Sequence, residues 1–202
     1  MNFLAHLRLA GETPESRLGN FLGDFVRGLP DDRFEPAIWA GIMHHRHLDS
    51  FTDRHPAWKA GRERLAPERR RFAGIVVDVF FDHFLSLWWD RFGWVDRDLD
   101  RFISECHRDL AATSELAPEE ARQAITRMRR QGWLESYREI DGIDEAMRRI
   151  SRRSERLGPI REAVDDLKRD YDGFERDFLD FFPDVLIRSG ELHAGLGGAD
   201  SL

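Results

Sequence analysis

Prolines and acidic residues divide this chain into a series of helical segments. Pro14-Glu15 and Pro67-Glu68 have the order expected where a helix begins, because the first turn tolerates proline and its dipole favours acidic side chains. Apolar residues then recur at helical spacings, whereas the alternation typical of strands is nearly absent. The expected helices span residues 4–9, 14–28, 36–55, 67–89, 96–112, 118–131, 143–157 and 159–182.

The length of the chain fits one domain. It has 202 residues, close to the size of about 100–200 residues that is usual for one domain, and no repeat or linker divides it. We therefore expect an all-α, single-domain helical bundle over residues 1–202, with its helical body at 1–193. Residues 194–202 are rich in glycine, which predicts a frayed tail.

Charge and composition exclude several classes of protein. The net charge of −7 argues against a nucleic-acid binder, whose domain is normally basic. The apolar runs at 72–77 and 79–81 are far shorter than the about 20 residues that a membrane-spanning helix needs. Cys106 is the only cysteine, which excludes an internal disulfide and fits a reducing compartment. We expect a cytoplasmic protein that binds neither nucleic acid nor membrane.

Several carboxylates and imidazoles lie within the most apolar stretches of the sequence. Asp24 has apolar neighbours on both sides, and valine and phenylalanine surround Asp78, Asp82 and His83. A helix that is apolar nearly all round is buried, and an ionised carboxylate in such a helix is costly unless it is paired or binds a metal. This conflict between pattern and residue type favours a metal site.

The spacing of these residues supports the same interpretation. Side chains four positions apart on a helix share a face, as His45 and Asp49 do, and as Asp78 and Asp82 do. Imidazole together with carboxylates suits a divalent ion such as Mn²⁺, Fe²⁺ or Zn²⁺. A His/Asp pair at this spacing also forms ordinary surface ion pairs, so spacing alone leaves both interpretations open.

Other catalytic templates do not fit. The sequence lacks a GxSxG elbow, a Walker loop, a GxGxxG turn and an HExxH helix. Cys106 and His107 are adjacent, and adjacent side chains on a helix point about 100° apart, which disfavours a Cys–His nucleophile pair.

Four motifs in the first 85 residues carry a family resemblance. They are MNFLAH at 1–6, GNFLGDFVRG at 19–28, HRHLDSFTD at 45–53 and DVFFDHFL at 78–85. In sequence and order they resemble the motifs of the bacterial acyl carrier protein phosphodiesterases, also called acyl carrier protein hydrolases. The C-terminal half resembles that family only in its length and helical layout.

The resemblance implies a fold, an activity and a cofactor. The family is similar to divergent HD-type metal-dependent phosphohydrolases, which are all-helical. Its members hydrolyse the phosphodiester between 4′-phosphopantetheine and a serine of holo-acyl carrier protein, giving apo-acyl carrier protein and 4′-phosphopantetheine. Mn²⁺ is the metal implied, with Fe²⁺, Mg²⁺ and Zn²⁺ as alternatives. Asp82-His83 reverses the usual His-Asp order of HD enzymes, so the motif does not assign ligands one by one.

Matching motif positions imply the residues of the site. The implied metal-centre residues are Asp24, His45, Asp49, Asp78, Asp82 and His83, with His6 and Asn20 near them. Arg46 or Arg27 would neutralise the charge that develops on the phosphoryl group. Asp53 or His6 would protonate the departing serine oxygen.

The implied partner, acyl carrier protein, is itself acidic. A chain of net charge −7 would repel it unless a local basic face were present. The predicted docking residues are Arg62, Arg64, Arg69, Arg70 and Arg71. A second basic run contains Arg148, Arg149, Arg152 and Arg153. Both clusters also fit an interpretation as solvated helix surfaces.

Two alternatives to this function remain open from the sequence. One keeps the metal centre but hydrolyses a nucleotide or another small phosphodiester. The other is a helical module that binds acyl carrier protein without turnover.

Overall fold

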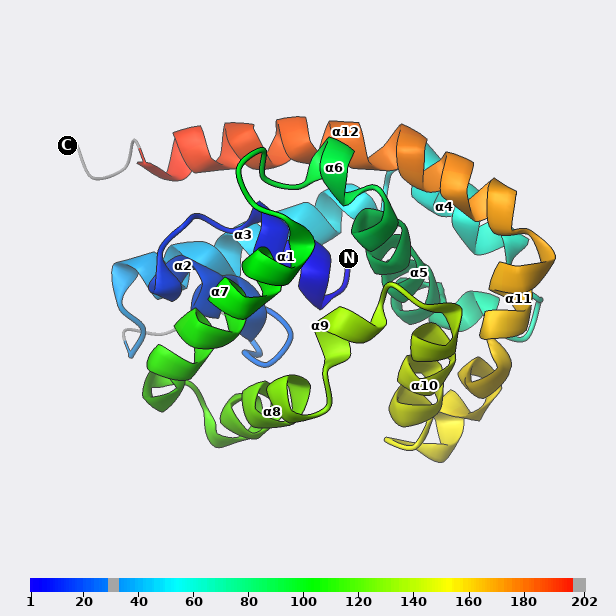
Figure 1. Cartoon of the computed structure of the whole chain (residues 1–202), viewed down its shortest axis with the longest axis horizontal. Coiled ribbons are helices and arrows are strands. Elements are labelled where there is room, and N and C mark those ends of the chain that lie inside the picture. Colours follow the sequence, from blue (N-terminus) through cyan, green and yellow to red (C-terminus); the bar gives the residue numbers. More distant parts are fainter. Residues whose placement is uncertain (29–32, 198–202) are drawn as a thin grey trace.

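The computed structural model of the chain describes residues 1–28 and 33–197. Within these residues it is built of α-helices and short 3-10 helices without a strand, which confirms the all-α prediction (Figure 1). The α-helices are α1 (Phe3–Leu9), α2 (Pro14–Leu22), α3 (Pro36–Thr52), α4 (Pro56–Arg64), α5 (Ala73–Leu87), α6 (Trp89–Phe92), α7 (Leu99–Ala112), α8 (Glu119–Arg130), α9 (Trp133–Ser136), α10 (Ile140–Ser151), α11 (Val164–Arg169) and α12 (Tyr171–Gly197). The 3-10 helices are η1 (Arg70–Phe72), η2 (Ser114–Leu116) and η3 (Glu155–Glu162). The likeness to HD-type enzymes stays a prediction.

Some helix ends differ from those expected. Helix α2 ends at Leu22 rather than at residue 28, and α4 and α9 form where no helix was expected. Helix α12 continues through Pro183 to Gly197, beyond both the expected end at residue 182 and the proposed start of the tail at 194. Phenylalanine and valine side chains on both sides of Pro183 are buried, and this packing outweighs the about 3 kcal/mol that proline costs inside a helix. Residues 198–202 of the predicted tail lie outside the described residues.

Helix α5 forms the centre of the molecule. Nearly all of its residues from Val76 to Ser86 are buried, and α1, α4, α10 and α12 pack around it (Figure 1). Phe80 and Phe81 of α5 meet Phe174 and Phe178 of α12 edge to face, with ring centroids 5.1 and 5.8 Å apart. The carboxylates of α5 are therefore enclosed by neighbouring helices. None of the helices in the described residues is both long and apolar enough to cross a bilayer.

Helices α2 and α3 cross at two glycines. A Cβ atom on Gly19 would lie only 2.3 Å from the carbonyl oxygen of Ile38 and 2.8 Å from Cα of Gly41. Backbones approach this closely only where no side chain stands between them. The crossing brings Asn20 of α2 against His44 and His45 of α3.

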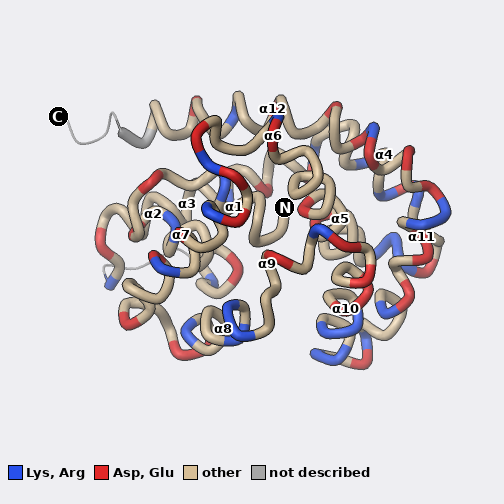
Figure 2. Tube along the Cα trace, viewed as in Figure 1, with Lys and Arg blue, Asp and Glu red and all other residues tan. Residues whose placement is uncertain are grey.

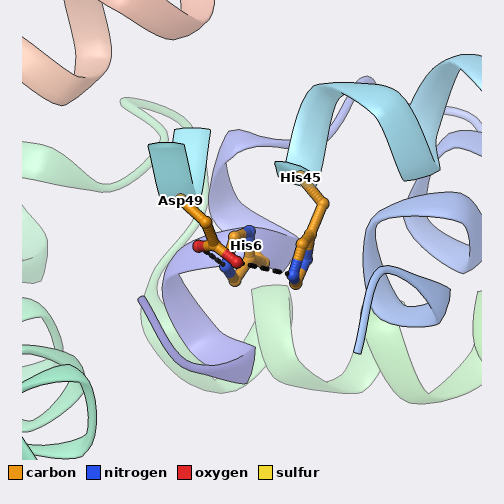
Figure 3. A group of neighbouring side chains, drawn as sticks. All are labelled: His6, His45 and Asp49. Atoms are coloured by element: carbon orange, nitrogen blue, oxygen red, sulfur yellow. Dashed lines mark hydrogen bonds and ion pairs between the residues drawn. The ribbon is translucent and has the colours of Figure 1, made fainter. Parts of the chain in front are cut away.

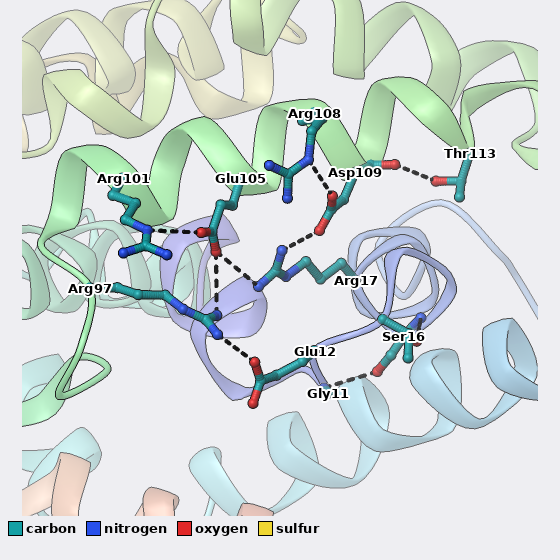
Figure 4. A network of polar contacts seen from close by, with 11 residues as sticks. Gly11, Glu12, Ser16, Arg17, Arg97, Arg101, Glu105, Arg108, Asp109 and Thr113 are labelled. Atoms are coloured by element: carbon teal, nitrogen blue, oxygen red, sulfur yellow. Dashed lines mark hydrogen bonds and ion pairs between the residues drawn. The ribbon is translucent and has the colours of Figure 1, made fainter.

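A network of ion pairs fastens α2 to α7 (Figure 4). The buried guanidinium of Arg17 lies between Glu105 and Asp109 of α7 and bonds the Asp109 carboxylate. Arg97 extends the network, since its guanidinium is 3.3 Å from Glu105 and 2.5 Å from Glu12. Removing one buried partner of such a network leaves an uncompensated charge inside the protein.

Candidate metal centre

Three side chains from α1 and α3 converge within the described part of the chain. His6, His45 and Asp49 each offer a ligand atom, and these atoms all lie within 4.8 Å of one another. The carboxylate of Asp49 reaches Nε2 of both rings, at 3.1 Å from His6 and 3.0 Å from His45 (Figure 3). The two imidazole rings stack with their centroids 3.6 Å apart. Two histidines and one carboxylate at these distances form a donor set suited to a divalent metal ion.

The backbone fixes which nitrogen of His45 faces the cluster. Nδ1 of His45 lies 2.8 Å from the carbonyl oxygen of Asn20. Because a carbonyl oxygen only accepts, Nδ1 carries the proton and donates it, as in many metal-binding histidines. Nε2 of the same ring then faces Asp49 at 3.0 Å and Asp24 at 3.7 Å. A lone pair cannot face two carboxylates without a cation between them, so this position requires either a proton or a metal ion.

Protonation states at the cluster fit metal binding. Burial, together with the neighbouring His45 ring, lowers the pKa of His6 to about 3, so this imidazole is neutral at pH 7. Burial opposes ionisation of Asp49, but the Met1 ammonium and His6 hold the pKa of Asp49 well below its usual range. A neutral imidazole beside an ionised carboxylate is the state in which both bind metal.

Asp78 joins the cluster through the first residue of the chain. The Met1 nitrogen lies 3.0 Å from Asp78 and 3.3 Å from Asp49, and Trp58 donates its indole N–H to Asp78 at 3.0 Å. Burial opposes the charge on the Met1 amine, yet Asp78 and Asp49 raise its pKa to about 11. A positive charge therefore already lies between two of the predicted metal ligands.

The cluster lies beside a cavity of about 460 Å³. Four predicted site residues line it, namely Asp24, Asp49, Asp53 and Asp78. Side chains of Phe3, Phe25, Ile75 and Val79 make up much of the remaining wall, and Arg153 brings a guanidinium to it. The cavity thus combines carboxylates, apolar surface and one arginine, an arrangement typical of a small-molecule site.

Asp82 holds the first turn of helix α1 in place. Its two oxygens accept the backbone N–H groups of Leu4 and Ala5, at 2.8 and 3.0 Å. Asn2 does not cap α1 with its side chain, so the buried Asp82 carboxylate satisfies these donors from another helix. This contact fixes the start of α1 and hence the position of His6.

The structure does not bring His83 to the cluster. Nδ1 of His83 lies 2.7 Å from the Tyr137 carbonyl oxygen, and Nε2 lies 2.9 Å from the Tyr171 hydroxyl. Neighbouring residues on a helix point about 100° apart, so Asp82 and His83 face different elements. Both nitrogens of His83 are engaged in structural contacts.

The predicted arginines lie outside the cavity wall. The guanidinium of Arg46 donates to the carbonyl oxygens of Val26 and Gly28, at 2.5 Å each, and so holds the segment after α2. Arg27 is exposed and does not line the cavity. Arg153 does line it, although the sequence indicated this residue only as part of a basic run.

The first basic cluster is partly engaged within the fold. Arg64 binds Asp177 and Asp170 at 2.6 Å, and the buried Arg69 binds Asp166 at 2.5 Å. These contacts hold α11 and α12 against the end of α4 and the segment that follows it. Arg62 and Arg71 are exposed, and Arg70 is half-buried and lies 3.3 Å from Glu63. Docking of a partner on this surface stays a prediction.

Comparisons with known proteins agree with the motifs. A family model described as acyl carrier protein phosphodiesterase matches residues 1–185. Proteins of that name from Enterobacter sp. (strain 638) and Salmonella agona (strain SL483) are each 36% identical to this chain over 189 residues. Each match covers 94% of this chain and 97% of the relative. No solved structure gives a significant match.

Proposed function

The chain belongs to the acyl carrier protein phosphodiesterase family, and from this membership we propose that it removes the prosthetic group from holo-acyl carrier protein. Water adds to phosphorus of the phosphodiester, the bond to the serine oxygen breaks, and that oxygen leaves with a proton. The products are apo-acyl carrier protein and 4′-phosphopantetheine. The convergence of His6, His45 and Asp49 beside an acidic cavity carries this proposal, because phosphodiester hydrolysis needs strong electrostatic stabilisation.

The residues present fit a divalent metal ion, and we propose Mn²⁺. His6, His45 and Asp49 would hold it, with Asp24 and Asp78 as the neighbouring carboxylates. When bound, such an ion supplies Lewis-acid polarisation of the phosphoryl group and makes water nucleophilic at neutral pH. A donor set of imidazole and carboxylate leaves Fe²⁺, Mg²⁺ and Zn²⁺ as alternatives to test against Mn²⁺.

Residues around the cluster keep its geometry fixed. The Asn20 carbonyl oxygen orients the His45 ring, and Asp82 positions the helix that carries His6. Both supports come from backbone or buried groups, which leave little freedom to the ligand atoms. Preorganisation of this kind is what makes electrostatic stabilisation of a transition state effective.

Two further residues of the cavity wall would neutralise the phosphoryl charge and transfer a proton. Arg153 lines the cavity and would neutralise charge on the phosphoryl oxygens, a role predicted for Arg46 or Arg27. Of the two predicted proton donors, His6 is held neutral by burial and contacts Asp49, whereas Asp53 lines the cavity at the end of α3. We therefore assign to Asp53 the transfer of the proton that the attacking water releases to the departing serine oxygen. We also propose that the reaction takes place in the cytoplasm.

The test is the intact mass of holo-acyl carrier protein after incubation with the full chain and Mn²⁺. We expect conversion to the apo form, with release of 4′-phosphopantetheine. Asp49→Asn should abolish this conversion, because it removes the carboxylate shared by both imidazoles. Asp180→Asn makes the same change on an exposed part of α12 and serves as the matched control.

Two outcomes of this assay would contradict the proposal. Hydrolysis of bis-p-nitrophenyl phosphate with no mass change of the carrier protein would indicate a small phosphodiester as substrate. Binding of the carrier protein with no hydrolysis of either substrate would indicate a non-catalytic module.

A further inference from the structure

A second cavity, of about 470 Å³, continues the first one between α8 and α10. The two cavities share Phe3, Phe25, Glu120 and Arg153 in their walls, so they form one groove. One end of the groove carries the carboxylates described above. The other end, here called the arginine cavity, is lined by Arg127 of α8, Arg149 of α10 and Arg153 after it. A ligand seated at the acidic end can therefore extend past these arginines.

The guanidinium groups of the arginine cavity have no ion-pair or hydrogen-bond partner among the described residues. This holds for Arg127, Arg149 and Arg153 alike. Arg122 and Arg148 lie on the same two helices but outside the cavity, and each holds a carboxylate, at 3.0 and 2.8 Å. Lys and Arg residues occur on both α8 and α10 in Figure 2. The charges of the three arginines that line the cavity therefore remain available to a ligand.

The surroundings of Arg149 leave its guanidinium group without an ion-pair partner in residues 1–28 and 33–197. The central carbon of its guanidinium lies over the Trp133 ring of α9, 4.3 Å from the ring centre. Its Nε atom is buried and has no acceptor in the described part of the chain. A buried donor without an acceptor lowers the stability of the protein. In Arg149 this unpaired donor lies at the wall of a cavity, where a ligand can supply the acceptor.

The charge of the lining identifies the chemistry of the ligand. Three arginines face one acidic residue, Glu120, in a chain whose net charge is −7. Guanidinium groups bind carboxylates through paired N–H donors. The pantetheine part of the prosthetic group carries no charge, so it gives guanidinium groups nothing to pair with. A ligand that matches this wall carries carboxylates close to the phosphodiester.

We propose that Arg127 and Arg149 of the arginine cavity bind carboxylate side chains of the carrier protein that lie next to its modified serine. The inference rests on the proposed function, because it places the phosphodiester at the acidic end of the groove. The phosphodiester then lies beside His6, His45 and Asp49 while the protein part of the substrate engages Arg127 and Arg149. The groove thus distinguishes a carrier protein from a small phosphodiester, which reaches only the first cavity.

The experiment compares two substrates in charge-reversal variants of the full chain. Arg127→Glu lies in the arginine cavity but not in the first cavity. We expect it to raise KM for holo-acyl carrier protein at least about tenfold, and to flatten its salt dependence, since paired charges are removed. Its rate on bis-p-nitrophenyl phosphate should stay within about twofold of wild type. Arg130→Glu makes the same change on an exposed part of α8 outside the groove and should leave both substrates unaffected.

Three outcomes would overturn the inference. KM for the carrier protein could stay at the wild-type value in Arg127→Glu. Both substrates could lose rate equally, which would assign the arginine to the phosphoryl group. A larger loss in Arg71→Glu would place docking on the surface of the first basic cluster.

A direct binding measurement separates this inference from the proposed function. If the wild-type chain releases no prosthetic group from the carrier protein, the proposed function fails. Fluorescence anisotropy of labelled apo-acyl carrier protein then still decides the docking site. Weaker binding in Arg127→Glu, but not in Arg130→Glu or Arg71→Glu, supports the arginine cavity, and equal binding in all proteins contradicts it.

Discussion

The ring of His45 occupies the space where a side chain at position 23 would stand. A Cβ atom on Gly23 would lie 2.2 Å from Cγ of His45, far inside van der Waals contact. Gly23 has ordinary right-handed helical dihedral angles, with φ of −52°, so glycine is needed here for space and not for its backbone conformation. The motif that contains Gly23 therefore packs directly against the motif that contains His45.

Gly23→Ala should disable the proposed metal centre while leaving the fold intact. The added methyl group must push the His45 ring away from Asp49 and Asp24. Because misplacement by about 1 Å can cost about 100-fold in rate, we expect at least that loss in the mass-shift assay, with unchanged helical circular dichroism. Gly190→Ala is the matched control, since its Cβ has no atom within 4 Å. Wild-type activity in Gly23→Ala would contradict the assigned role of His45.

Asp82→Ala should destabilise the protein as well as inactivate it. The substitution leaves the N–H groups of Leu4 and Ala5 buried without an acceptor, which costs about 1–3 kcal/mol each. Urea denaturation measures the change in the free energy of unfolding. Asp24→Asn is the contrasting variant, because the Asp24 side chain is 47% exposed and should affect activity without this loss. Equal stability of the two variants would show that Asp82 does not support α1.

Much of the fold is predictable because prolines and apolar spacing act locally. The start of α3 at Pro36 and its end before Pro56 follow from the backbone restrictions of proline. The continuation of α12 through Pro183 does not, since it depends on phenylalanines that pack against α5. Local pattern contains no information about such long-range packing, and the short α9 cannot be predicted from the sequence for the same reason.

The site was predictable in part. The apolar surroundings of Asp24 and Asp78 and the spacing of His45 and Asp49 indicated residues that the structure brings to one cluster or its cavity. A buried aspartate looks the same in sequence whether it binds a metal or accepts hydrogen bonds from another helix. Asp82 does the latter, from a position 78 residues away from Leu4. Only the packing of α1 on α5 distinguishes the two.

Arg17 and Asp109 should show strong coupling in a double-mutant cycle. Arg17→Met leaves the buried Asp109 carboxylate with the exposed Arg108, at 3.2 Å, as its only ion-pair partner among the described residues (Figure 4). Breaking a buried pair in this way costs about 3–5 kcal/mol, measured as the free energy of unfolding in urea. Arg17→Met combined with Asp109→Leu should recover part of that loss. Strictly additive effects would show that the pair contributes nothing specific.

Because of the lowered pKa of His44, we expect the protein to be less stable in mild acid than at neutral pH. Its ring nitrogens lie 3.0 Å from Asn20 and 3.0 Å from Ser189, and burial, with the stacked His193 ring, lowers its pKa to about 3. An unfolded histidine titrates near 6.5, so below that pH the unfolded state binds more protons than the folded state. The contribution of His44 to the free energy of unfolding is therefore fully present above pH 6.5. It decreases as the pH falls below 6.5, by up to about 1.4 kcal/mol per pH unit.

The measurement for His44 is urea denaturation at pH 7 and pH 5. His44→Gln should lose less stability than wild type between these two values. Burial raises the pKa of Asp82 to about 7, which acts in the opposite direction but is common to both proteins and cancels in the comparison. Identical losses in the two proteins would show that His44 does not titrate as an enclosed neutral group.

Metal binding at His6, His45 and Asp49 is tested most directly by titrating the chelator-stripped protein with Mn²⁺ while turnover of holo-acyl carrier protein is followed by mass. We predict that the stripped chain is inactive, and that bound Mn²⁺ and activity rise together to a stoichiometric end point. In Asp49→Asn both should be lost, because that carboxylate lies within 3.1 Å of each imidazole. Full turnover by the metal-free protein, or an unchanged Mn²⁺ titration in Asp49→Asn, would contradict the assignment of this cluster as a metal centre.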